Sequence, residues 1–506
     1  MDHLSQRLPA VTTMARGGAR RPDRPPAAYR PDGPAWLPTL LALSLLASSS
    51  VLLGCSGDEW VGQTAIPPPL PVDEVGGWDA TPQTFATTFY VRPPGEPYGS
   101  GDGSSWTNAF SDLPAALQRG AQYYVAAGEY DEAEPDGEAY VDHTFEDPED
   151  GEQFIGIFKA TEQDHGSEDG WESLLAEGPA RFGPFAFVTG RYIIDGQTGE
   201  AATGHGIHVA VKPEACPSSH SLTLYFNWNA QSHFIGLHHL DISHCGGVGD
   251  PEGPAQDAIY GYHTDDSEVS NVTIKHCYVH DTKRVLTFIL GWTNVLIEDC
   301  YYERSGQHHE SSSLAMRDAE NVVVRRNVFK DAINVYVSLQ TVRHVHLYSN
   351  VFVGTIDGWD IWNSIHSSEP LTNVFIYGNT FYNLTGLSTG LRFSGTTTNL
   401  QVFNNIWAHN RTNQIPMAGD HDFNAFWDNW RVDTDPQQDL NEQVDEPNAQ
   451  VLDADPFVDG EALDFHLTIP TEPGATLPAP YDLDHDGLRH GQDGVWDRGA
   501  FERSAP

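Results

Sequence analysis

The sequence predicts an all-β solenoid, in which similar short units stack along one axis. Three observations support this fold class. A motif returns about every 23 to 29 residues, each copy alternates apolar and polar residues, and each copy ends in Cys or Asn. The copies begin at Val272, Val295, Val322, Val345, Val374 and Leu400. Self-similarity at a fixed period indicates units that bury a shared core by stacking.

Each repeat is expected to hold three strands. In residues 285–303 these are Val285–Leu290, Val295–Glu298 and Tyr301–Glu303, with a tight turn at Cys300. The same turn holds Cys277 in one repeat and an asparagine in four others, namely Asn327, Asn350, Asn379 and Asn405. Asparagine tolerates the left-handed backbone, and its amide can stack on the amide of the next coil. The sequence therefore predicts a structural ladder and about eight recognisable coils, with the regular body starting near Tyr192.

The two ends of the chain are expected to differ from the repeats. Residues 86–180 are predicted to form an N-terminal cap with an acidic insertion, residues 181–410 the repeats, and residues 411–506 an irregular C-terminal coil and cap. Within the N-terminal cap, apolar residues of Asn108–Leu117 follow helical spacing, with Ser111 as a possible N-cap. A cap of this kind would close the exposed sheet edge of a solenoid.

The first 54 residues read as a targeting segment. An apolar run from Leu37 to Leu53 is followed by Gly54 and Cys55, which resembles a bacterial lipobox. We expect a signal peptide over residues 1–54, a lipid on Cys55 that anchors the chain to a membrane, and a flexible linker over residues 55–85. The expected location is the bacterial cell envelope, as an outer-membrane lipoprotein, or the extracellular space. An ordinary cleaved signal or a membrane-anchoring helix remains the alternative.

The net charge argues against one class of partner, and the cysteine content indicates which disulfide bonds are possible. The chain has 71 acidic and 27 basic residues and a net charge of -44, which opposes binding to nucleic acid. Export would permit disulfide bonds. Cys277 and Cys300 occupy equivalent turns and are either bridged or simply small ladder residues, and Cys216 and Cys245 form the other plausible pair.

Several motifs resemble those of secreted right-handed parallel β-helix proteins of the pectin-lyase-like superfamily. They are the asparagine ladder, the three-strand coil, Gly101–Phe110 (GDGSSWTNAF), Asp484–Gly487 (DHDG) and Asp497–Glu502 (DRGAFE). The resemblance covers about residues 86–503 and implies that fold. It also implies lyases or glycoside hydrolases that act on acidic polysaccharides, or non-catalytic adhesion proteins, because one scaffold hosts many functions.

The first strands of successive coils should form one sheet whose outward side chains make a continuous strip. One expected row is Leu290, Arg317 and Gln340, and its neighbour is Phe288, Ala315, Ser338 and Phe393. Aromatic rings beside polar groups suit sugars. The predicted substrate-binding residues are Phe288, Gln340, Asp360, Trp362 and Arg392.

Two enzymatic chemistries remain open at this strip. β-Elimination of a uronic-acid polymer needs a base and a group that neutralises the substrate carboxylate, for which His309, Glu310 and Arg317 are the candidates. Hydrolysis needs two carboxylates across a cleft, and sequence spacing selects no such pair.

A separate motif, Asp482–Gly487 (DLDHDG), predicts a structural Ca²⁺ loop that uses Asp482, Asp484 and Asp486. Its twelfth position is Asp493 rather than the usual Glu.

The sequence thus predicts a surface-anchored β-helix that binds an extracellular acidic polysaccharide, with or without cleaving it. The alternative is a non-catalytic β-helix lipoprotein of adhesion or envelope structure.

Overall fold

In a computed structural model the chain divides into two units, residues 1–66 and 67–506. The structure describes residues 75–503 apart from 81, 96, 132–139, 213–215, 218–219, 227–230, 246–255, 262–267, 307–310, 356–362, 387–389, 416, 432–437 and 442–443. The predicted signal peptide, Cys55, His309, Glu310, Asp360 and Trp362 lie outside these residues. Among the helices of the described part, none has both the length and the apolarity that a membrane crossing requires.

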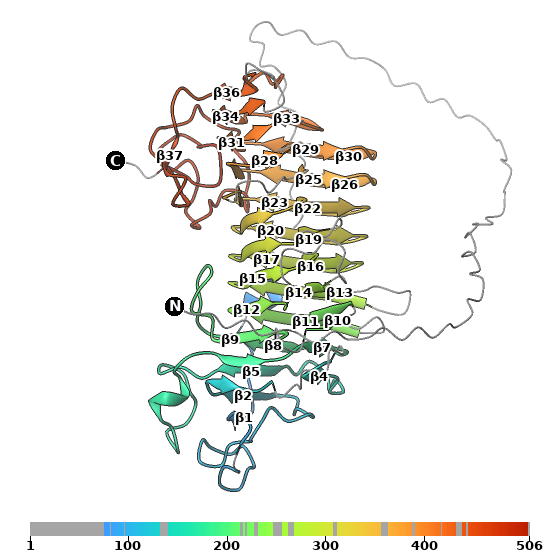
Figure 1. Ribbon diagram of the computed structural model, residues 1–506, viewed down its shortest axis with the longest axis vertical. Coiled ribbons are helices and arrows are strands. Elements are labelled where there is room, and N and C mark those ends of the chain that lie inside the picture. The colour runs from blue at the N-terminus through green and yellow to red at the C-terminus, as the bar shows by residue number, and fades with distance from the viewer. Residues whose placement is uncertain are drawn as a thin grey trace, which may run out of the picture. The chain divides into compact units, whose positions relative to one another are not determined.

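Three long parallel sheets make up the described body (Figure 1). In the described residues, sheet A has 12 strands: β1 (Thr87–Val91), β2 (Ala121–Val125), β5 (Ile155–Lys159), β8 (Tyr192–Asp195), β11 (Gln231–His238), β14 (Glu268–Lys275), β17 (Thr293–Glu298), β20 (Glu320–Arg325), β23 (Arg343–Tyr348), β26 (Leu371–Tyr377), β30 (Thr397–Phe403) and β33 (Asp420–Asp422). Sheet B, over the same described ranges, also has 12: β3 (Gly128–Glu129), β6 (Ala180–Phe182), β9 (Ile207–Ala210), β12 (Leu240–Ser243), β15 (Tyr278–Thr282), β18 (Tyr301–Ser305), β21 (Val328–Ala332), β24 (Val351–Val353), β27 (Thr380–Tyr382), β31 (Ile406–Ala408), β34 (Ala425–Trp427) and β36 (Gln450–Val451).

Sheet C has 9 strands in the described part of the chain: β4 (His143–Phe145), β7 (Phe185–Phe187), β10 (Ser221–Phe226), β13 (Gln256–Gly261), β16 (Val285–Leu290), β19 (Ser312–Arg317), β22 (Val335–Gln340), β25 (Asn363–Ser367) and β29 (Leu391–Phe393). A small parallel sheet joins β28 (Thr385–Gly386), β32 (Arg411–Thr412) and β35 (Trp430–Arg431). The antiparallel pair β37 (Phe457–Asp459) and β38 (Asp464–Leu467) lies in the C-terminal segment.

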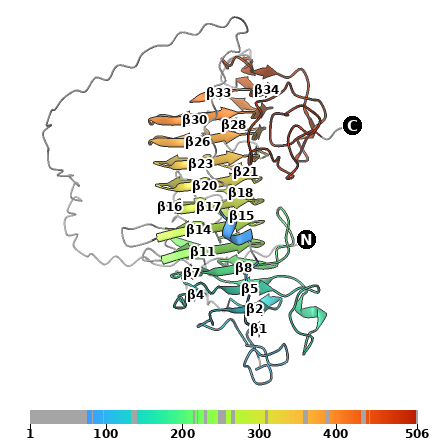
Figure 2. The same ribbon diagram turned by 180° about the vertical axis from the view of Figure 1, so that it is seen from behind.

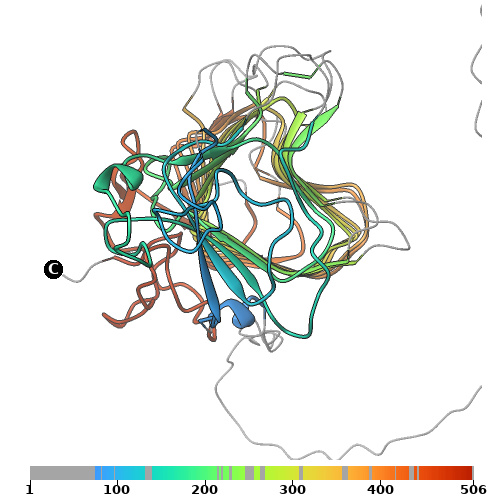
Figure 3. The same cartoon turned by 90° about the horizontal axis from the view of Figure 1, so that it is seen from below.

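Each coil visits the three sheets in turn, as β14, β15 and β16 do before β17 returns to sheet A. Viewed along the axis, the sheets enclose a common interior (Figure 3). The predicted right-handed parallel β-helix is therefore confirmed. The coil chosen for the prediction is confirmed as well, because its three strands are β16, β17 and β18.

Stacked side chains hold successive coils together inside the body. One column of buried rings runs through sheet B and consists of Tyr302, Phe329, Phe352, Phe381, Trp407 and Phe426. The predicted asparagine ladder is also present, but the left-handed backbone expected of the asparagines falls on the residue before each of them, as at Arg326 and Ser349. The Asn350 amide donates to Asn379 Oδ1 at 3.0 Å and to the Val324 carbonyl at 2.9 Å, and Asn350 Oδ1 accepts from the Asn327 backbone amide at 3.0 Å. The hydrogen-bonding groups of these buried amides are paired with other groups of the protein, so we assign the ladder a structural role.

The structure shows which of the cysteines form a disulfide bond, a question that the sequence left open. Cys216 and Cys245 form a disulfide bond with a Cα–Cα distance of 5.5 Å. Cys277 and Cys300 are buried free thiols at the start of the ladder, where the Cys277 backbone amide donates to Cys300 Sγ at 3.4 Å.

Two expectations for the N-terminal region are wrong. The segment Asn108–Leu117 is not helical, because its backbone is bound from elsewhere: Phe110 bridges to Val91 of β1, and the Leu117 amide donates to Asp147 Oδ1 at 2.6 Å. The regular body also starts well before Tyr192. Strands β4 and β5, in the stretch expected to be a loop-rich insertion, already belong to sheets C and A.

Two chain segments pack on the outside of the body (Figure 2). The N-terminal strap, residues 75–86, lies on sheet A, and the C-terminal segment, residues 452–503, lies on sheets A and B. The N-terminal strap, which contains the short 3-10 helix η2 (Gly77–Ala80), places Trp78 against Phe154 and Phe234 at ring distances of 5.5 and 5.6 Å. The C-terminal segment packs the ring of Tyr481 on Tyr348 and Tyr377 at 5.1 and 5.0 Å. A second 3-10 turn, η3 (Ser173–Leu175), lies in the N-terminal coils.

Candidate functional site

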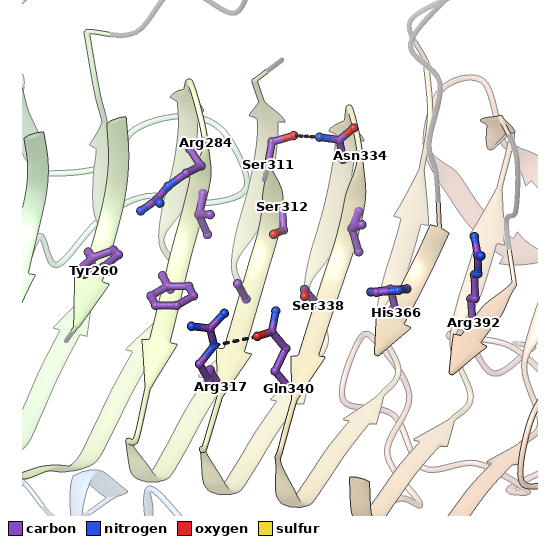
Figure 4. Close-up of a pocket in the computed structure, with 14 residues that line it drawn as sticks. Tyr260, Arg284, Ser311, Ser312, Arg317, Asn334, Ser338, Gln340, His366 and Arg392 are labelled. Carbon is purple, nitrogen blue, oxygen red and sulfur yellow. Dashed lines mark hydrogen bonds between the residues drawn. The ribbon is translucent and has the colours of Figure 1, made fainter. Parts of the chain in front are cut away.

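A groove of about 740 Å³ runs over the outer face of sheet C (Figure 4). It crosses β13, β16, β19, β22, β25 and β29, one strand per coil. Its described lining residues are Tyr260, Arg284, Val285, Phe288, Ser311, Ser312, Ala315, Arg317, Asn334, Val335, Ser338, Gln340, His366 and Arg392.

Strand register sets the order of side chains along the groove floor. The central row, which we call the floor row, is Tyr260, Phe288, Ala315, Ser338, His366 and Arg392. Neighbouring members lie about 4.8 Å apart, the spacing of adjacent strands. The row thus begins with two aromatic rings, continues with two small residues, and ends with an imidazole and a guanidinium.

The sequence placed Phe393 in this row, and that placement is wrong. Phe393 pairs with Ser367, one position further along the strand, while Arg392 pairs with His366. The cause is turn length: β22 ends at Gln340 and β23 begins at Arg343, whereas β25 ends at Ser367 and β26 begins only at Leu371. Counting back from the ladder by a fixed interval therefore misses the correct residue in the later coils.

Two guanidinium groups in the groove have no carboxylate within salt-bridge distance in the described residues. Arg317 is exposed, and its Nε donates to Gln340 Oε1 at 2.7 Å. Arg392 is exposed at the end of the floor row. The described lining residues also include no Asp or Glu. In a chain of net charge -44, this concentration of positive charge is a local exception.

The third arginine of the groove, Arg284, forms an ion pair with a carboxylate of the protein. Arg284 binds the buried carboxylate of Asp257 through Nε at 3.0 Å and Nη2 at 2.5 Å. Burial alone would raise the pKa of Asp257, but hydrogen bonds from His220 and Arg284 hold that pKa below its usual value. Asp257 therefore stays ionised and fixes Arg284 at the groove wall, where a second polar contact joins Asn334 Nδ2 to Ser311 Oγ at 2.9 Å.

His366 is the titratable group on the groove floor that sequence reasoning missed. Its side chain is partly buried between Ser338 and Arg392 in the floor row. Burial lowers the pKa of this imidazole, and the neighbouring positive charge of Arg392 lowers it further. Both effects favour the neutral imidazole, which is the form that can accept a proton.

The structure brings four of the predicted site residues together in one groove, namely Phe288, Arg317, Gln340 and Arg392. The predicted row of Leu290, Arg317 and Gln340 is present as well. The other predicted groove residues, His309, Glu310, Asp360 and Trp362, lie outside the described residues. Tyr260 and His366 carried no sequence signal beyond their place in a strand, which required the correct register.

Each of the three aspartates of the predicted calcium loop is bound by donors from the protein itself. Asp482 pairs with Arg489, Asp484 accepts the backbone amides of Leu488 and Glu502, and Asp486 binds His466 at 2.7 Å. Within the described ranges, no cluster of three or more His, Cys, Asp or Glu is arranged to hold a metal ion. A Ca²⁺ ion in this loop would have to displace Arg489 and His466 from Asp482 and Asp486, and the calcium loop stays a prediction.

The chain is distantly similar to several solved structures. No protein-family model matches the chain, and no curated protein matches it. Among solved structures, pectate lyase Pel9A is 13% identical with a TM-score of 0.45, over 83% of this chain and 98% of that one. XylC in complex with xylose is 8% identical with a TM-score of 0.40, over 82% and 99%. The GH136 lacto-N-biosidase from Eubacterium ramulus is 12% identical with a TM-score of 0.37, over 72% and 68%. Because these likenesses are distant, the fold assignment rests on the three parallel sheets of this chain.

Proposed function

We propose that the groove on sheet C binds an extended acidic polysaccharide. The observation that carries the proposal is the pair of exposed guanidinium groups, Arg317 and Arg392, which have no carboxylate partner in the described part of the chain. They belong to coils three strand spacings apart, or about 14 Å. A polymer with an acidic group on successive sugars could therefore contact both.

The rest of the floor suits a sugar chain. Tyr260 and Phe288 stack on each other with ring centres 5.0 Å apart, which leaves one ring face of Phe288 directed toward the small Ala315. Ala315 and Ser338 leave room above the floor, and Gln340 offers an amide at the edge. Aromatic faces pack on the C–H faces of sugars, while hydroxyl and amide groups bind sugar hydroxyls.

Arginine substitutions in the groove test the proposal directly. We expect Arg317→Ala and Arg392→Ala each to weaken binding to an acidic polymer by about tenfold to a hundredfold, because each removes a hydrogen-bonded charge worth about 1.5 to 3 kcal/mol. Titration calorimetry with polygalacturonate, alginate, hyaluronan and chondroitin sulfate would measure this loss. Dextran serves as the neutral polymer.

A matched control is Arg343→Ala. Arg343 is also exposed, but it lies on β23 of sheet A and pairs with Glu320 at 2.6 Å. Its removal should leave affinity unchanged. If the two groove variants bind every acidic polymer as tightly as Arg343→Ala does, the groove is not the binding site.

Location at the cell surface would give the groove access to extracellular polymers, and it is part of the same proposal. It depends on lipidation of Cys55, a residue outside the described ranges. Mass spectrometry of the protein purified from membranes would detect the lipid on Cys55.

A further inference from the structure

A second pocket, of about 380 Å³, lies on sheet A beside the N-terminal strap. It is lined by the strap, by β2, β5, β8 and β11, and by the segments that follow β5 and β8. We infer that this strap pocket binds an amino sugar through its ammonium group. The inference concerns a different sheet from the groove and does not depend on the function proposed for the groove.

The floor of the strap pocket is aromatic. Strand register aligns Tyr124, Phe158 and Asp195 in one row across β2, β5 and β8. Two residues before Phe158, on the same face of β5, a Cβ atom at Gly156 would clash with the rings of Phe158 and Phe85. Glycine therefore lets the Phe158 ring lie across β5, with Phe85 of the strap beside it at a ring distance of 5.7 Å.

The charge of the strap pocket is opposite to that of the groove. Its described lining contains three carboxylates and no Lys or Arg. Asp79 binds Lys275 at 2.9 Å, and Asp195 Oδ1 lies 2.8 Å from His239 Nδ1. Asp164 is exposed, and no basic side chain of the described residues lies within salt-bridge distance of it. A cationic ligand would supply the partner that Asp164 lacks.

Gln197 holds Asp164 and Asp195 at one side of the pocket. Its backbone amide donates to Asp195 Oδ1 at 2.7 Å, and its Nε2 donates to Asp164 Oδ2 at 3.3 Å. The Tyr124 hydroxyl fixes Asp164 further, donating to Oδ1 at 2.5 Å. Burial would raise the pKa of Asp195, but the hydrogen bond with His239 holds that pKa below its usual value. Asp195 therefore stays ionised, and a cation next to both carboxylates would relieve their repulsion.

A hexosamine with a free amino group matches all parts of this lining. Its ammonium group can bind Asp164 and Asp195, because a carboxylate oxygen accepts more than one hydrogen bond. The C–H face of its ring can pack on Phe158, and its hydroxyls can reach the side-chain amides of Gln122 and Gln197. A simple alkyl amine would leave these amides unused.

Titration calorimetry with the β-1,4-linked disaccharide of glucosamine tests the inference. Its fully N-acetylated form has the same rings but no charge, and we expect it to bind about tenfold to a hundredfold more weakly. Asp164→Asn should weaken binding of the charged disaccharide by the same factor. Asp164 is exposed, so this variant should fold like the wild type, which a melting curve checks.

The matched control is Glu162→Gln. Glu162 is exposed in the same loop but does not line the pocket. Its substitution removes one negative charge, as Asp164→Asn does, and should leave the affinity unchanged. This control is needed because a chain of net charge -44 attracts any cation at long range.

Two further measurements test whether the sugar itself is recognised. Phe158→Leu should weaken binding of the glucosamine disaccharide by about threefold to tenfold, because the ring loses its aromatic partner. Putrescine also carries two ammonium groups but no sugar, and it should bind more weakly and be unaffected by Phe158→Leu.

The contrary outcomes are distinct. Equal affinity for the charged and N-acetylated disaccharides, or no binding of either, overturns the inference. Equal losses in Asp164→Asn and Glu162→Gln would show long-range attraction and overturn the assignment to this pocket. Putrescine binding as tightly as the disaccharide would overturn the choice of a sugar. The groove takes no part in these measurements, so the failure of either proposal leaves the other standing.

Discussion

The outer faces of sheets A and C share one backbone geometry but treat charge in opposite ways. On sheet A, Glu298 is only 7% exposed and binds Lys275 at 3.2 Å and Arg325 at 2.6 Å. The strap adds Asp79, which binds Lys275 at 2.9 Å. On sheet C, Arg317 and Arg392 are exposed, and the described residues provide no carboxylate for either of them.

The difference follows from what covers each face. The strap and the C-terminal segment cover parts of sheet A, so the charges beneath them are largely removed from water and must be paired within the chain. Sheet C carries an open groove, so its charges can remain hydrated until a ligand arrives. We infer that the paired charges of sheet A support stability, whereas the two exposed arginines of sheet C, which have no carboxylate partner among the described residues, are available to a ligand.

The largest expected effect on stability is on sheet A. Burial would raise the pKa of Glu298, but Arg325, Lys275 and Arg326 hold it at about 2. Glu298→Ala removes the shared partner of these partly buried cations, two of which keep another carboxylate (Lys275 with Asp79, Arg326 with Asp299), and should lower the free energy of unfolding by about 1.5 to 3 kcal/mol. Thermal and denaturant unfolding would measure the loss. Polysaccharide affinity, measured below the melting temperature, should not change.

Glu320→Ala is the matched control on the same sheet. Its partner Arg343 has a side chain that is 59% exposed, so losing this pair should cost no more than about 1 kcal/mol. If the two variants were equally destabilised, burial would not be what separates the two kinds of ion pair.

The smallest expected effect concerns the aspartate loop of the C-terminal segment. Because Asp482, Asp484 and Asp486 are already bound by protein donors, we expect the melting temperature to be the same in Ca²⁺ and in chelator. Differential scanning calorimetry measures it. A rise in Ca²⁺ that Asp486→Ala abolishes would instead establish the calcium loop predicted by the sequence.

Repetition explains how much of the fold could be predicted. The motif that ends in Asn or Cys repeats because each coil needs the same tight turn, so Asn327, Asn350 and Asn379 identified the ladder directly. The helix predicted over Asn108–Leu117 failed because long-range partners, Val91 and Asp147, took its backbone hydrogen bonds. Local spacing carries no information about such partners.

The site was only partly predictable for the same reason. Arg317 and Gln340 could be found because their coils have turns of the same length. His366 was missed because the turn after β25 is longer, which shifts the register of the later coils. The covering of sheet A depends on contacts between residues far apart in sequence, such as Asp79 with Lys275, and no local pattern encodes it.

The most direct test compares one acidic polymer with its own carboxyl-reduced form. Both have the same sugars and linkages, so titration calorimetry of the wild-type protein isolates the contribution of the carboxylates. The exposed cations of sheet C predict binding of the acidic polymer that weakens as salt is added, and loss of binding after reduction. Equal affinity for the two forms, or affinity unaffected by salt, would contradict the account.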